Sequence, residues 1–369
     1  MASIGLFSEG SLTPGRSPHP YYRELGEQIV MGDRLGFDFF STTQSYGLDH
    51  ADSTFSVVPD PLALFLAQTA RTERIKVLTG ITIAPFHHPA MALSDFAAAD
   101  VLSGGRVMIG IGRGHPWLYE RLGLDQNESK ARASEFCSMV RTILDAPHAR
   151  HTIGGTFWRM HDFELLPQFI QPHPEVYFAV SISPSSAVEA ASHRFGILIP
   201  AYLGTPIEAV EMLIKTYREE YRKLWNDPGK ILLGVNFYGL PDERAAIAMG
   251  ARGLAMQMKV FARNMIGYTH KFGEQYSAYR EIGSLFEAMS DPKVCESRVL
   301  AEFPRYLAFW GNRDTLDKKM IAVIERLRPD SLALNIDCGG IPLEATAASM
   351  RFFAAELMPS IRHCLDRAV

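Results

Sequence analysis

The sequence of 369 residues predicts a single (β/α)8 barrel, the TIM-barrel fold, on three observations. Segments with strand-like and helix-like patterns alternate along nearly the whole chain. We count eight strand-like segments, each followed by a helix, which is the number that such a barrel requires. No repeat, linker or low-complexity tract divides the chain, so we expect one domain over residues 1–369. A doubly wound open sheet would also alternate strands and helices, but it usually has fewer strands.

The expected strands are short runs rich in apolar and β-branched residues, bounded by glycine, proline or polar residues. The third, Lys76–Ala84, is nearly continuous in such residues, as strands buried on both faces tend to be. The eight strands are expected at residues 3–7, 37–43, 76–84, 106–112, 175–182, 196–203, 230–239 and 331–337.

The expected helices place apolar residues three and four positions apart. In the first helix, Tyr22, Leu25, Ile29 and Gly32 share one stripe. The third begins near Pro89 and ends at Gly104, since proline suits a helix start and glycine a helix end. The other helices are expected at residues 59–71, 127–144, 185–194, 206–225 and 242–250, with one last helix over 343–361.

Two segments interrupt this alternation. Residues 150–165, after the fourth helix, are typical of a β-hairpin, and residues 262–304 lie between the seventh and eighth strands without a clear strand. The second segment combines mixed charge with aromatic residues such as Tyr268 and Phe286, too many apolar groups for a permanently disordered linker. We therefore expect residues 262–304 to form a mobile lid at the carboxyl-terminal mouth of the barrel.

The composition is that of a soluble globular protein, with 47% hydrophobic and 21% charged residues. A net charge of −4 without a basic cluster argues against nucleic acid or an anionic membrane as a partner. Four cysteines without a C-x-x-C pair argue against a zinc site or a disulfide framework. Because we find no signal peptide and no membrane-spanning run, we expect a cytoplasmic protein.

The glycine-rich stretch LSGGRVMIGIGRGHPW, Leu102–Trp117, ends the fourth strand, at the face where TIM barrels keep their active sites. It is not a dinucleotide-binding G-x-G-x-x-G motif, because His115 takes the third position and Pro116 and Trp117 predict no helix there. Glycines let a planar or anionic ligand approach the backbone, and Arg113 offers a charged fork suited to phosphate. The alternative is a strand end with a tight turn and a surface arginine.

Four stretches resemble one family. HHPAMALSDFAAADVLSGGRVMIGIGRG (His87–Gly114) is similar to the bacterial luciferase-like family of flavin-dependent monooxygenases, which has a His-Pro after strand three, an S-G-G-R turn and a strand ending in glycines and arginine. Val176–Gly196 resembles the fifth strand and S-P-x-S helix start of that family, Glu344–Arg362 its last helix, and Leu35–Tyr46 its second strand. The matches follow the order of the family and leave out residues 262–304.

The resemblance implies an FMN site. Arg113, Ser183 and Ser186 match the family positions that bind the FMN phosphate, Gly80–Ile81 matches a non-proline cis peptide beneath the flavin ring, and Gly112 replaces a cysteine that some luciferases place beside the flavin. The residues permit this site, because SPSS opens a helix whose free N–H groups and dipole favour phosphate. The alternatives are helix capping by the serines and a strand bulge at Gly80.

At the end of strand two the sequence departs from the luciferases. They have Glu followed by two histidines, the first acting in catalysis, whereas this chain has Gln44, Ser45 and Tyr46. Loss of the histidine removes the obvious general base, so we do not expect light-emitting oxidation of long-chain aldehydes. Tyr46, His50 or His115 could take over proton transfer, and the spacing selects none of them. No histidine or carboxylate spacing is typical of a metal site, so we expect no metal.

We therefore expect a flavin-dependent monooxygenase of the two-component type. As the resemblance implies, a separate flavin reductase supplies FMNH2, O2 adds at flavin C4a, and the peroxyflavin transfers one oxygen to an apolar or aromatic organic substrate. We expect Gln44, Phe86, Trp117 and Tyr202 to line the substrate pocket, and a homodimer by family analogy. Two alternatives stay open: an F420-dependent oxidoreductase that transfers hydride, and a non-catalytic flavin-binding partner subunit.

Overall fold

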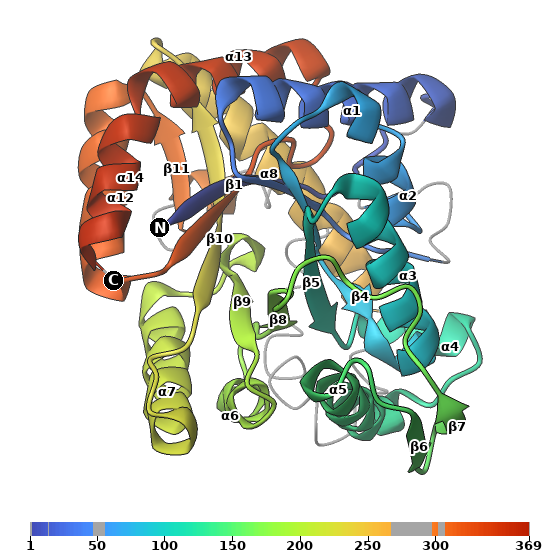
Figure 1. The fold of residues 1–369 in the computed structure, drawn as a ribbon. Coiled ribbons are helices and arrows are strands. Elements are labelled where there is room, and N and C mark those ends of the chain that lie inside the picture. The colour runs from blue at the N-terminus through green and yellow to red at the C-terminus, as the bar shows by residue number, and fades with distance from the viewer. Residues whose placement is uncertain (1, 14, 47–55, 267–296, 302–306, 369) are drawn as a thin grey trace.

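The chain forms the expected TIM barrel in the computed structural model, which describes residues 2–13, 15–46, 56–266, 297–301 and 307–368 (Figure 1). Within these ranges, parallel strands close in the order β1-β2-β3-β5-β8-β9-β10-β12, and β12 pairs with β1. The barrel strands are β1 (Ser3–Ser8), β2 (Phe39–Thr42), β3 (Lys76–Thr79) with β4 (Thr82–Ile83), β5 (Val107–Gly112), β8 (Val176–Ala179), β9 (Gly196–Pro200), β10 (Ile231–Gly239) and β12 (Ser331–Asn335).

Helices surround the barrel, and their ends follow the sequence signals. Proline lies in the first turn of α1, α3 and α6, and α1 and α3 end at Gly36 and Gly104, both in the left-handed conformation. The helices are α1 (Pro18–Leu35), α2 (Pro61–Leu66), α3 (Pro89–Ser103), α4 (Pro116–Arg121), α5 (Ser129–Asp145), α6 (Pro184–Ser192), α7 (Ile207–Trp225), α8 (Glu243–Ile266), α12 (Arg313–Leu327), α13 (Leu343–Glu356) and α14 (Met358–Ala368).

The barrel interior is packed with side chains and is not a pore. The in-facing residues come from alternate positions of the strands, and in their midst Phe7 stacks on Tyr202 with ring centroids 4.6 Å apart. A second and larger core lies between the strands and the helices. The inner cluster consists of Phe7, Phe39, Leu78, Met108, Tyr177, Leu198, Tyr202, Leu232 and Ala333.

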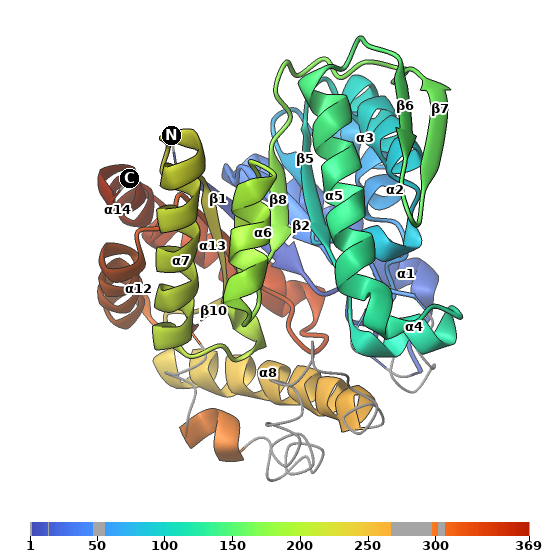
Figure 2. The ribbon, with the colours of Figure 1, turned by 90° about the horizontal axis from the view of Figure 1, so that it is seen from below.

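The predicted hairpin is confirmed as the antiparallel pair β6 (His151–Gly154) and β7 (Arg159–Phe163). One carboxylate of α5 fixes its turn: Glu135 accepts hydrogen bonds from the backbone N–H groups of Thr156, Phe157 and Trp158 at 2.8–2.9 Å. The hairpin therefore rests on α5, at the edge of the barrel and away from its strands (Figure 2).

Three elements differ from the prediction. A short helix, α4, begins at Pro116, where we expected none; proline lacks only an N–H that the first turn of a helix leaves unbonded anyway. An additional strand, β11 (Ala308–Gly311), pairs with the carboxyl-terminal half of β10 outside the closed barrel. The predicted last helix is two helices, α13 and α14, which are interrupted at Leu357.

Helix α8 is much longer than predicted. We expected it to end at Gly250, but a Cβ there would lie 2.5 Å from the Trp310 ring, so this glycine permits close packing and is not a helix stop. A Cβ on Gly253 would similarly meet the Cys338 carbonyl at 2.5 Å. Residues 262–266 of the predicted lid thus belong to α8 and residues 297–301 are helical, while most of the segment lies outside the described residues. Its role as a lid stays a prediction.

Helix α8 crosses the carboxyl-terminal mouth of the barrel (Figure 2). It starts against Trp310 of β11, passes β12 at Gly253, and reaches Glu9 beyond β1 through Gln257. Its last turns bring Phe261 against α4. We call the apolar side chains gathered there the mouth cluster; it includes Ile83, Trp117, Leu254, Met258, Phe261 and Trp310.

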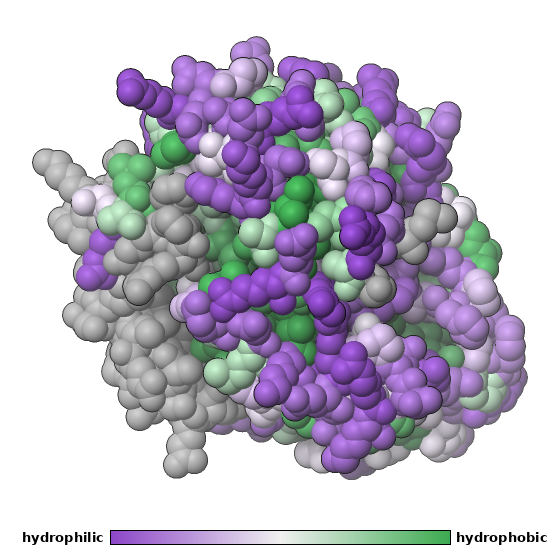
Figure 3. Space-filling model, turned by 90° about the vertical axis from the view of Figure 1, so that its left-hand side faces the viewer, coloured by the Kyte–Doolittle hydropathy of each residue, from purple (hydrophilic) through white to green (hydrophobic). Residues whose placement is uncertain are grey.

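The outer face formed by α7, α12 and α14 is largely hydrophilic, with scattered apolar side chains (Figure 3). In the part of the chain that the structure describes, no helix combines the length and the hydropathy needed to cross a membrane.

Candidate active site at the carboxyl ends of the strands

The end of β5 explains two glycines of the Leu102–Trp117 motif. A Cβ on Gly110 would overlap the Thr79 carbonyl oxygen, and one on Gly112 would lie 2.5 Å from Ile81 Cδ1. The peptide bond between Gly80 and Ile81 is cis, as the resemblance implied, and it separates β3 from β4. The glycines therefore first make room for this neighbouring segment, and contact of Gly80, Ile81 and Gly112 with a flavin stays a proposal.

The predicted phosphate-binding residues follow two adjacent strands. Arg113 comes directly after β5, and Ser183 precedes α6 after β8, which pairs with β5 at Ile111 and Phe178. Ser183 is the N-cap residue of α6, yet its side chain caps no N–H group; its Oγ lies 2.9 Å from Ser185 Oγ. Simple helix capping therefore does not explain this serine.

A lysine that sequence reasoning missed lies at the same helix end. Lys130, in the first turn of α5, donates from Nζ to Ser185 Oγ at 3.4 Å. Ser186 is buried, and its N–H bonds to the Ser183 carbonyl at 3.0 Å. A helix N-terminus with serine hydroxyls and a nearby cation favours an anion. We call Arg113, Lys130, Ser183, Ser185 and the start of α6 the anion cradle.

Gln44, just after β2, connects neighbouring segments through side-chain hydrogen bonds. Its Oε1 accepts from the Ile83 N–H at 2.9 Å and from His87 Nε2 at 3.1 Å, and its Nε2 donates to the Pro59 carbonyl. Burial lowers the pKa of His87, so this ring is neutral at neutral pH. Tyr46 lies beside it, with ring centroids 6.5 Å apart, and burial raises the pKa of the phenol.

The third predicted proton-transfer group, His115, lies between aromatic rings. It stacks on Trp117 at 4.3 Å between centroids and meets the edge of Phe261 at 5.5 Å. Burial among these rings lowers the pKa of His115 to about 4, so it is uncharged at neutral pH. His50 lies outside the described residues.

Three of the predicted pocket residues lie at the mouth cluster, since Phe86 packs against it, Trp117 belongs to it and Gln44 bonds Ile83 within it; Tyr202 lies apart. Trp117 is fully buried in the mouth cluster, and Phe86 packs on Tyr119 at 4.9 Å between ring centroids. Tyr202 belongs to the inner cluster, where it stacks on Phe7. Whether any of these rings meets a substrate stays a prediction.

Sequence reasoning missed a buried acid pair at this mouth. Glu9 follows β1 and Asp337 follows β12, and only 1% and 2% of their surfaces are exposed. Gln257 Nε2 donates to Glu9 Oε1 at 2.7 Å, and Ser8 Oγ donates to Asp337 Oδ2 at 2.5 Å. Burial and mutual repulsion raise the pKa of Glu9 to about 8, and burial raises that of Asp337 to about 6. The in-facing alternation Gly5, Phe7, Glu9 is the signal that could have located it.

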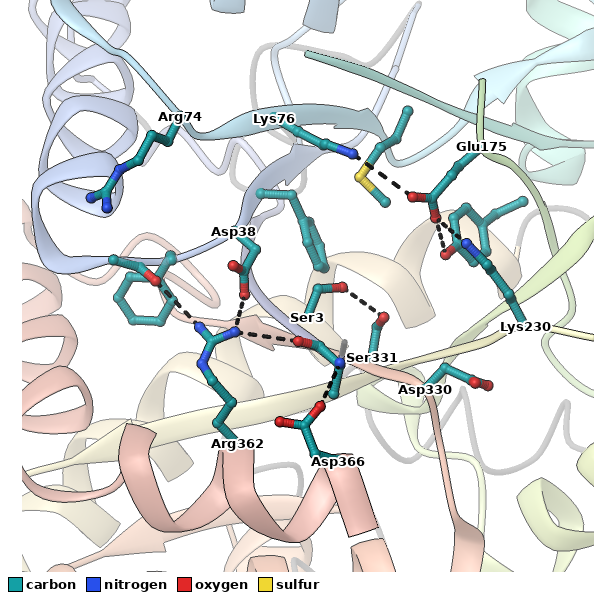
Figure 4. Close-up of a pocket in the computed structure, with 16 residues that line it drawn as sticks. Ser3, Asp38, Arg74, Lys76, Glu175, Lys230, Asp330, Ser331, Arg362 and Asp366 are labelled. Atoms are coloured by element: carbon teal, nitrogen blue, oxygen red, sulfur yellow. Dashed lines mark hydrogen bonds and ion pairs between the residues drawn. The ribbon is translucent and has the colours of Figure 1, made fainter. Parts of the chain in front are cut away.

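The opposite, amino-terminal end of the barrel holds a cavity of about 690 Å³ (Figure 4). Several of its charges make ion contacts: Arg362 contacts Asp38 at 2.8 Å, and Lys230 and Lys76 both contact Glu175, at 3.2 and 3.8 Å. Ionised groups that neutralise one another at this face typically stabilise a TIM barrel, since catalysis belongs to the other face.

Comparison with known proteins finds relatives over most of the chain. The model of the luciferase-like monooxygenase family matches residues 3–328. The oxygenase component of the flavin-dependent trigonelline monooxygenase from Acinetobacter baylyi is 26% identical over 353 residues, which cover 92% of this chain and 89% of that protein.

Solved structures show the same fold. Monooxygenase RslO1 from Streptomyces bottropensis has a TM-score of 0.77 at 24% identity over 97% of this chain and 99% of that one. The oxygenating constituent of 3,6-diketocamphane monooxygenase from Pseudomonas putida, in complex with FMN, has a TM-score of 0.74 at 17% identity over 98% and 99%. F420-dependent enzymes also match, among them a secondary alcohol dehydrogenase with a TM-score of 0.69 at 18% identity over 98% and 99%. By the family match, which spans most of its length, the chain belongs to the luciferase-like monooxygenases.

Proposed function

We propose that this protein is the oxygenase of a two-component flavin system. It takes up FMNH2 made by a separate flavin reductase and uses O2 to insert one oxygen atom into an apolar or aromatic organic substrate. The family and the similarity to a monooxygenase oxygenase component support this class of reaction. A structural relative solved with FMN supports the choice of cofactor. By the same analogy we propose a homodimer.

The anion cradle is the observation that carries the proposal. Arg113 and Lys130 bring two cations to the ends of adjacent strands, and Ser183 and Ser185 add hydroxyl groups at the start of α6. These groups fit a phosphate monoester, which carries a double negative charge. They would hold the FMN phosphate, and the Gly80–Ile81 segment, without a side chain on Gly80, would face the flavin ring.

The mouth cluster would supply the dry surroundings that the chemistry needs. Bound reduced flavin supplies the electrons that activate O2. The protein contributes by excluding water and by offering apolar contacts to the substrate. His115 stacks on Trp117, and Phe261 meets both rings edge-on, so these contacts join the start of α4 to α8 at this side of the mouth. With a pKa of about 4, His115 stays uncharged at neutral pH and is a weak base, so it contributes to this site as a packed ring and not as a proton acceptor.

The test is anaerobic binding of reduced cofactor, followed by mixing with O2. We expect FMNH2 to quench the tryptophan fluorescence tightly, and F420H2 to quench it weakly, because the cradle offers few cations for a long anionic tail. Oxygen from 18O2 should then enter an added aromatic substrate. Tight binding of F420H2 with hydride transfer would favour the alternative oxidoreductase. Binding of FMNH2 without oxygen incorporation into any of a panel of apolar and aromatic substrates would favour a non-catalytic subunit.

A further inference from the structure

The acid at the end of β1 points into the barrel. Alternate residues of a strand share a face, so Gly5, Phe7 and Glu9 face the same way. Phe7 belongs to the inner cluster and stacks on Tyr202, which places Glu9 one step nearer the mouth. The side chain is almost fully buried. Its Oε1 accepts from Gln257 of α8, whereas its Oε2 finds no hydrogen-bond partner among the described residues.

Asp337 is the neighbour of Glu9 across β1 and β12. The strands pair Phe7 with Asn335, and the Ile336 N–H continues the ladder to the Phe7 carbonyl at 3.1 Å, so Asp337 lies opposite Glu9. The other groups that face the pair are uncharged at neutral pH. They are Gln257 of α8, Cys338 after β12, Tyr202 after β9, and Tyr21 and Gln28 of α1.

The hydrogen bonds of Gln257 fix which oxygen of Glu9 carries a proton. Two buried carboxyl groups this close do not both ionise, and the pKa of about 8 assigns the proton to Glu9 at neutral pH. Cys338 Sγ donates to Gln257 Oε1, which turns the amide N–H group of Gln257 toward Glu9 Oε1. Because Oε1 is thereby an acceptor, the acid proton resides on Oε2.

Two further polar atoms near the ends of the neighbouring strands lack a hydrogen-bond partner among the described residues. They are Ser41 Oγ of β2 and Asn335 Oδ1 of β12, and the strand registers pair both residues with the in-facing Phe7. Buried polar atoms are nearly always hydrogen-bonded, because an unmade bond costs about 1–3 kcal/mol. Glu9 Oε2, Ser41 Oγ and Asn335 Oδ1 therefore offer hydrogen-bonding positions that a bound molecule or a water molecule can complete.

We propose that Glu9 donates a hydrogen bond from Oε2 to a carbonyl-type oxygen of the molecule bound at this mouth, with Gln257 and Asp337 as its positioning residues. The inference rests on the proposed function, because that oxygen belongs either to the flavin ring or to the organic substrate. A site built to bond an oxygen rejects an analogue that lacks it far more strongly than a purely apolar pocket does. Glu9 thus sets a preference for molecules that carry such an acceptor.

The experiment measures binding by calorimetry at pH 6.5 and pH 9.5. The probes are oxidised FMN, acetophenone, and ethylbenzene as the analogue without oxygen. Glu9→Gln is the matched control, because its amide N–H takes the place of the acid proton at every pH. Glu9→Met keeps the length and removes the donor, and circular dichroism checks its fold. Asp337→Asn removes the neighbouring charge and tests the positioning role.

The wild-type protein should bind the acceptor-bearing probe about tenfold more weakly at pH 9.5 than at pH 6.5, since ionised Glu9 repels an oxygen. Glu9→Gln should bind it equally at both, and Glu9→Met weakly at both. In Asp337→Asn the loss of probe affinity should begin at a lower pH, because the charge of Asp337 no longer raises the pKa of Glu9. A pH effect on FMN assigns the bond to the flavin; an effect on acetophenone that ethylbenzene does not show assigns it to the substrate.

Two results would overturn the proposal. One is that the affinities of the wild-type protein and of Glu9→Gln change with pH in the same way for all three probes. The other is an infrared spectrum of the wild-type protein without a protonated-carboxyl band that Glu9→Gln removes. Both leave the proposed function standing as long as FMN binds in an Arg113-dependent manner. Failure of FMN and FMNH2 to bind the folded wild-type protein would instead contradict the proposed function.

Discussion

Both ends of the barrel carry charged side chains, but the partners of these side chains differ between the two ends. At the amino-terminal end, cations and carboxylates from several strands neutralise one another, as Arg362 does with Asp38 and Lys230 with Glu175 (Figure 4). At the carboxyl-terminal end, Glu9 and Asp337 lie buried side by side, with no cation paired to either among the described residues. Ion pairs hold chain segments together, whereas an incomplete set of polar partners is what a binding site leaves for its ligand.

The backbone shows the same contrast. The amino-terminal cavity uses ordinary strand starts, and its side chains reach backbone groups, as the Ala2 N–H reaches Asp366 at 2.9 Å. The carboxyl-terminal mouth is instead crossed by helix α8, whose Gln257 reaches Glu9. We therefore propose that the amino-terminal end serves stability and the carboxyl-terminal end serves binding.

The largest effect we expect is on the pH dependence of stability. The pKa of Glu9 is about 8 in the folded protein and 4.5 as an ordinary glutamate, so the folded state binds more protons between these values. The contribution of Glu9 to the free energy of unfolding is therefore fully present at low pH and falls as pH rises toward 8, by about 2 kcal/mol between pH 6 and pH 8. Urea unfolding of Glu9→Gln should lack that fall.

Arg362→Ala, at the opposite end, serves as the control for this measurement. It should lower the free energy of unfolding equally at both pH values, because arginine does not titrate in this range. If Glu9→Gln and the wild-type protein lose the same stability between pH 6 and pH 8, the acid pair is not the titrating group.

The next effect concerns cofactor affinity. Arg113→Ala should weaken FMNH2 binding about 10- to 150-fold, because hydrogen bonds to charged groups are worth about 1.5–3 kcal/mol. Fluorescence titration under nitrogen measures it, and thermal unfolding should change little. Arg113→Lys should restore only part of the affinity, since lysine cannot form the bidentate contact. Unchanged FMNH2 affinity in Arg113→Ala would contradict the proposal that the anion cradle binds the FMN phosphate.

The eight barrel strands could be predicted because each is a compact run rich in apolar residues, whereas the additional strand β11 was missed. The helix ends were harder, since the same residue serves two purposes. Glycine ends α3 at Gly104 through a left-handed conformation, but in α8 Gly250 makes room for Trp310. Proline similarly opens α4 at Pro116, where the sequence pattern predicts no helix. Only the packing partner distinguishes these cases, and that partner is far away in the sequence.

Some residues of the candidate site could likewise be predicted from the sequence, and others could not. Arg113, Ser183 and the cis peptide at Gly80–Ile81 belong to local motifs that a family resemblance can indicate. Glu9 and Lys130 belong to no such motif. They were identified by their hydrogen bonds to Gln257 and Ser185, which lie 248 and 55 residues away in the sequence. A single acidic or basic residue at a strand or helix end carries no signal until the fold brings its partner.

A smaller effect would test the structural role of the amino-terminal end. Arg362 pairs with Asp38 at 2.8 Å and donates to the carbonyl oxygens of Ala2 and Gly36, so it joins α14 to β1 and to the loop before β2. Because the side chain is partly exposed, we expect Arg362→Ala to lower the free energy of unfolding by about 1 kcal/mol. FMNH2 affinity should stay at the wild-type value. A large loss of FMNH2 affinity in Arg362→Ala would contradict the assignment of a purely structural role to the amino-terminal end.

The smallest effect concerns one hydroxyl group of the cofactor site. Ser186→Ala should weaken FMNH2 binding only about two- to threefold, because the N–H groups at the start of α6 still favour the phosphate. Ser3→Ala is a matched control, since Ser3 bonds Ser331 at 2.7 Å beside the amino-terminal cavity. It should leave FMNH2 affinity unchanged. If the two serine variants lose the same affinity in fluorescence titrations, the small loss at Ser186 reflects general loosening of the barrel. If Ser186→Ala loses as much as Arg113→Ala, the hydroxyl group and not the helix end dominates that part of the anion cradle.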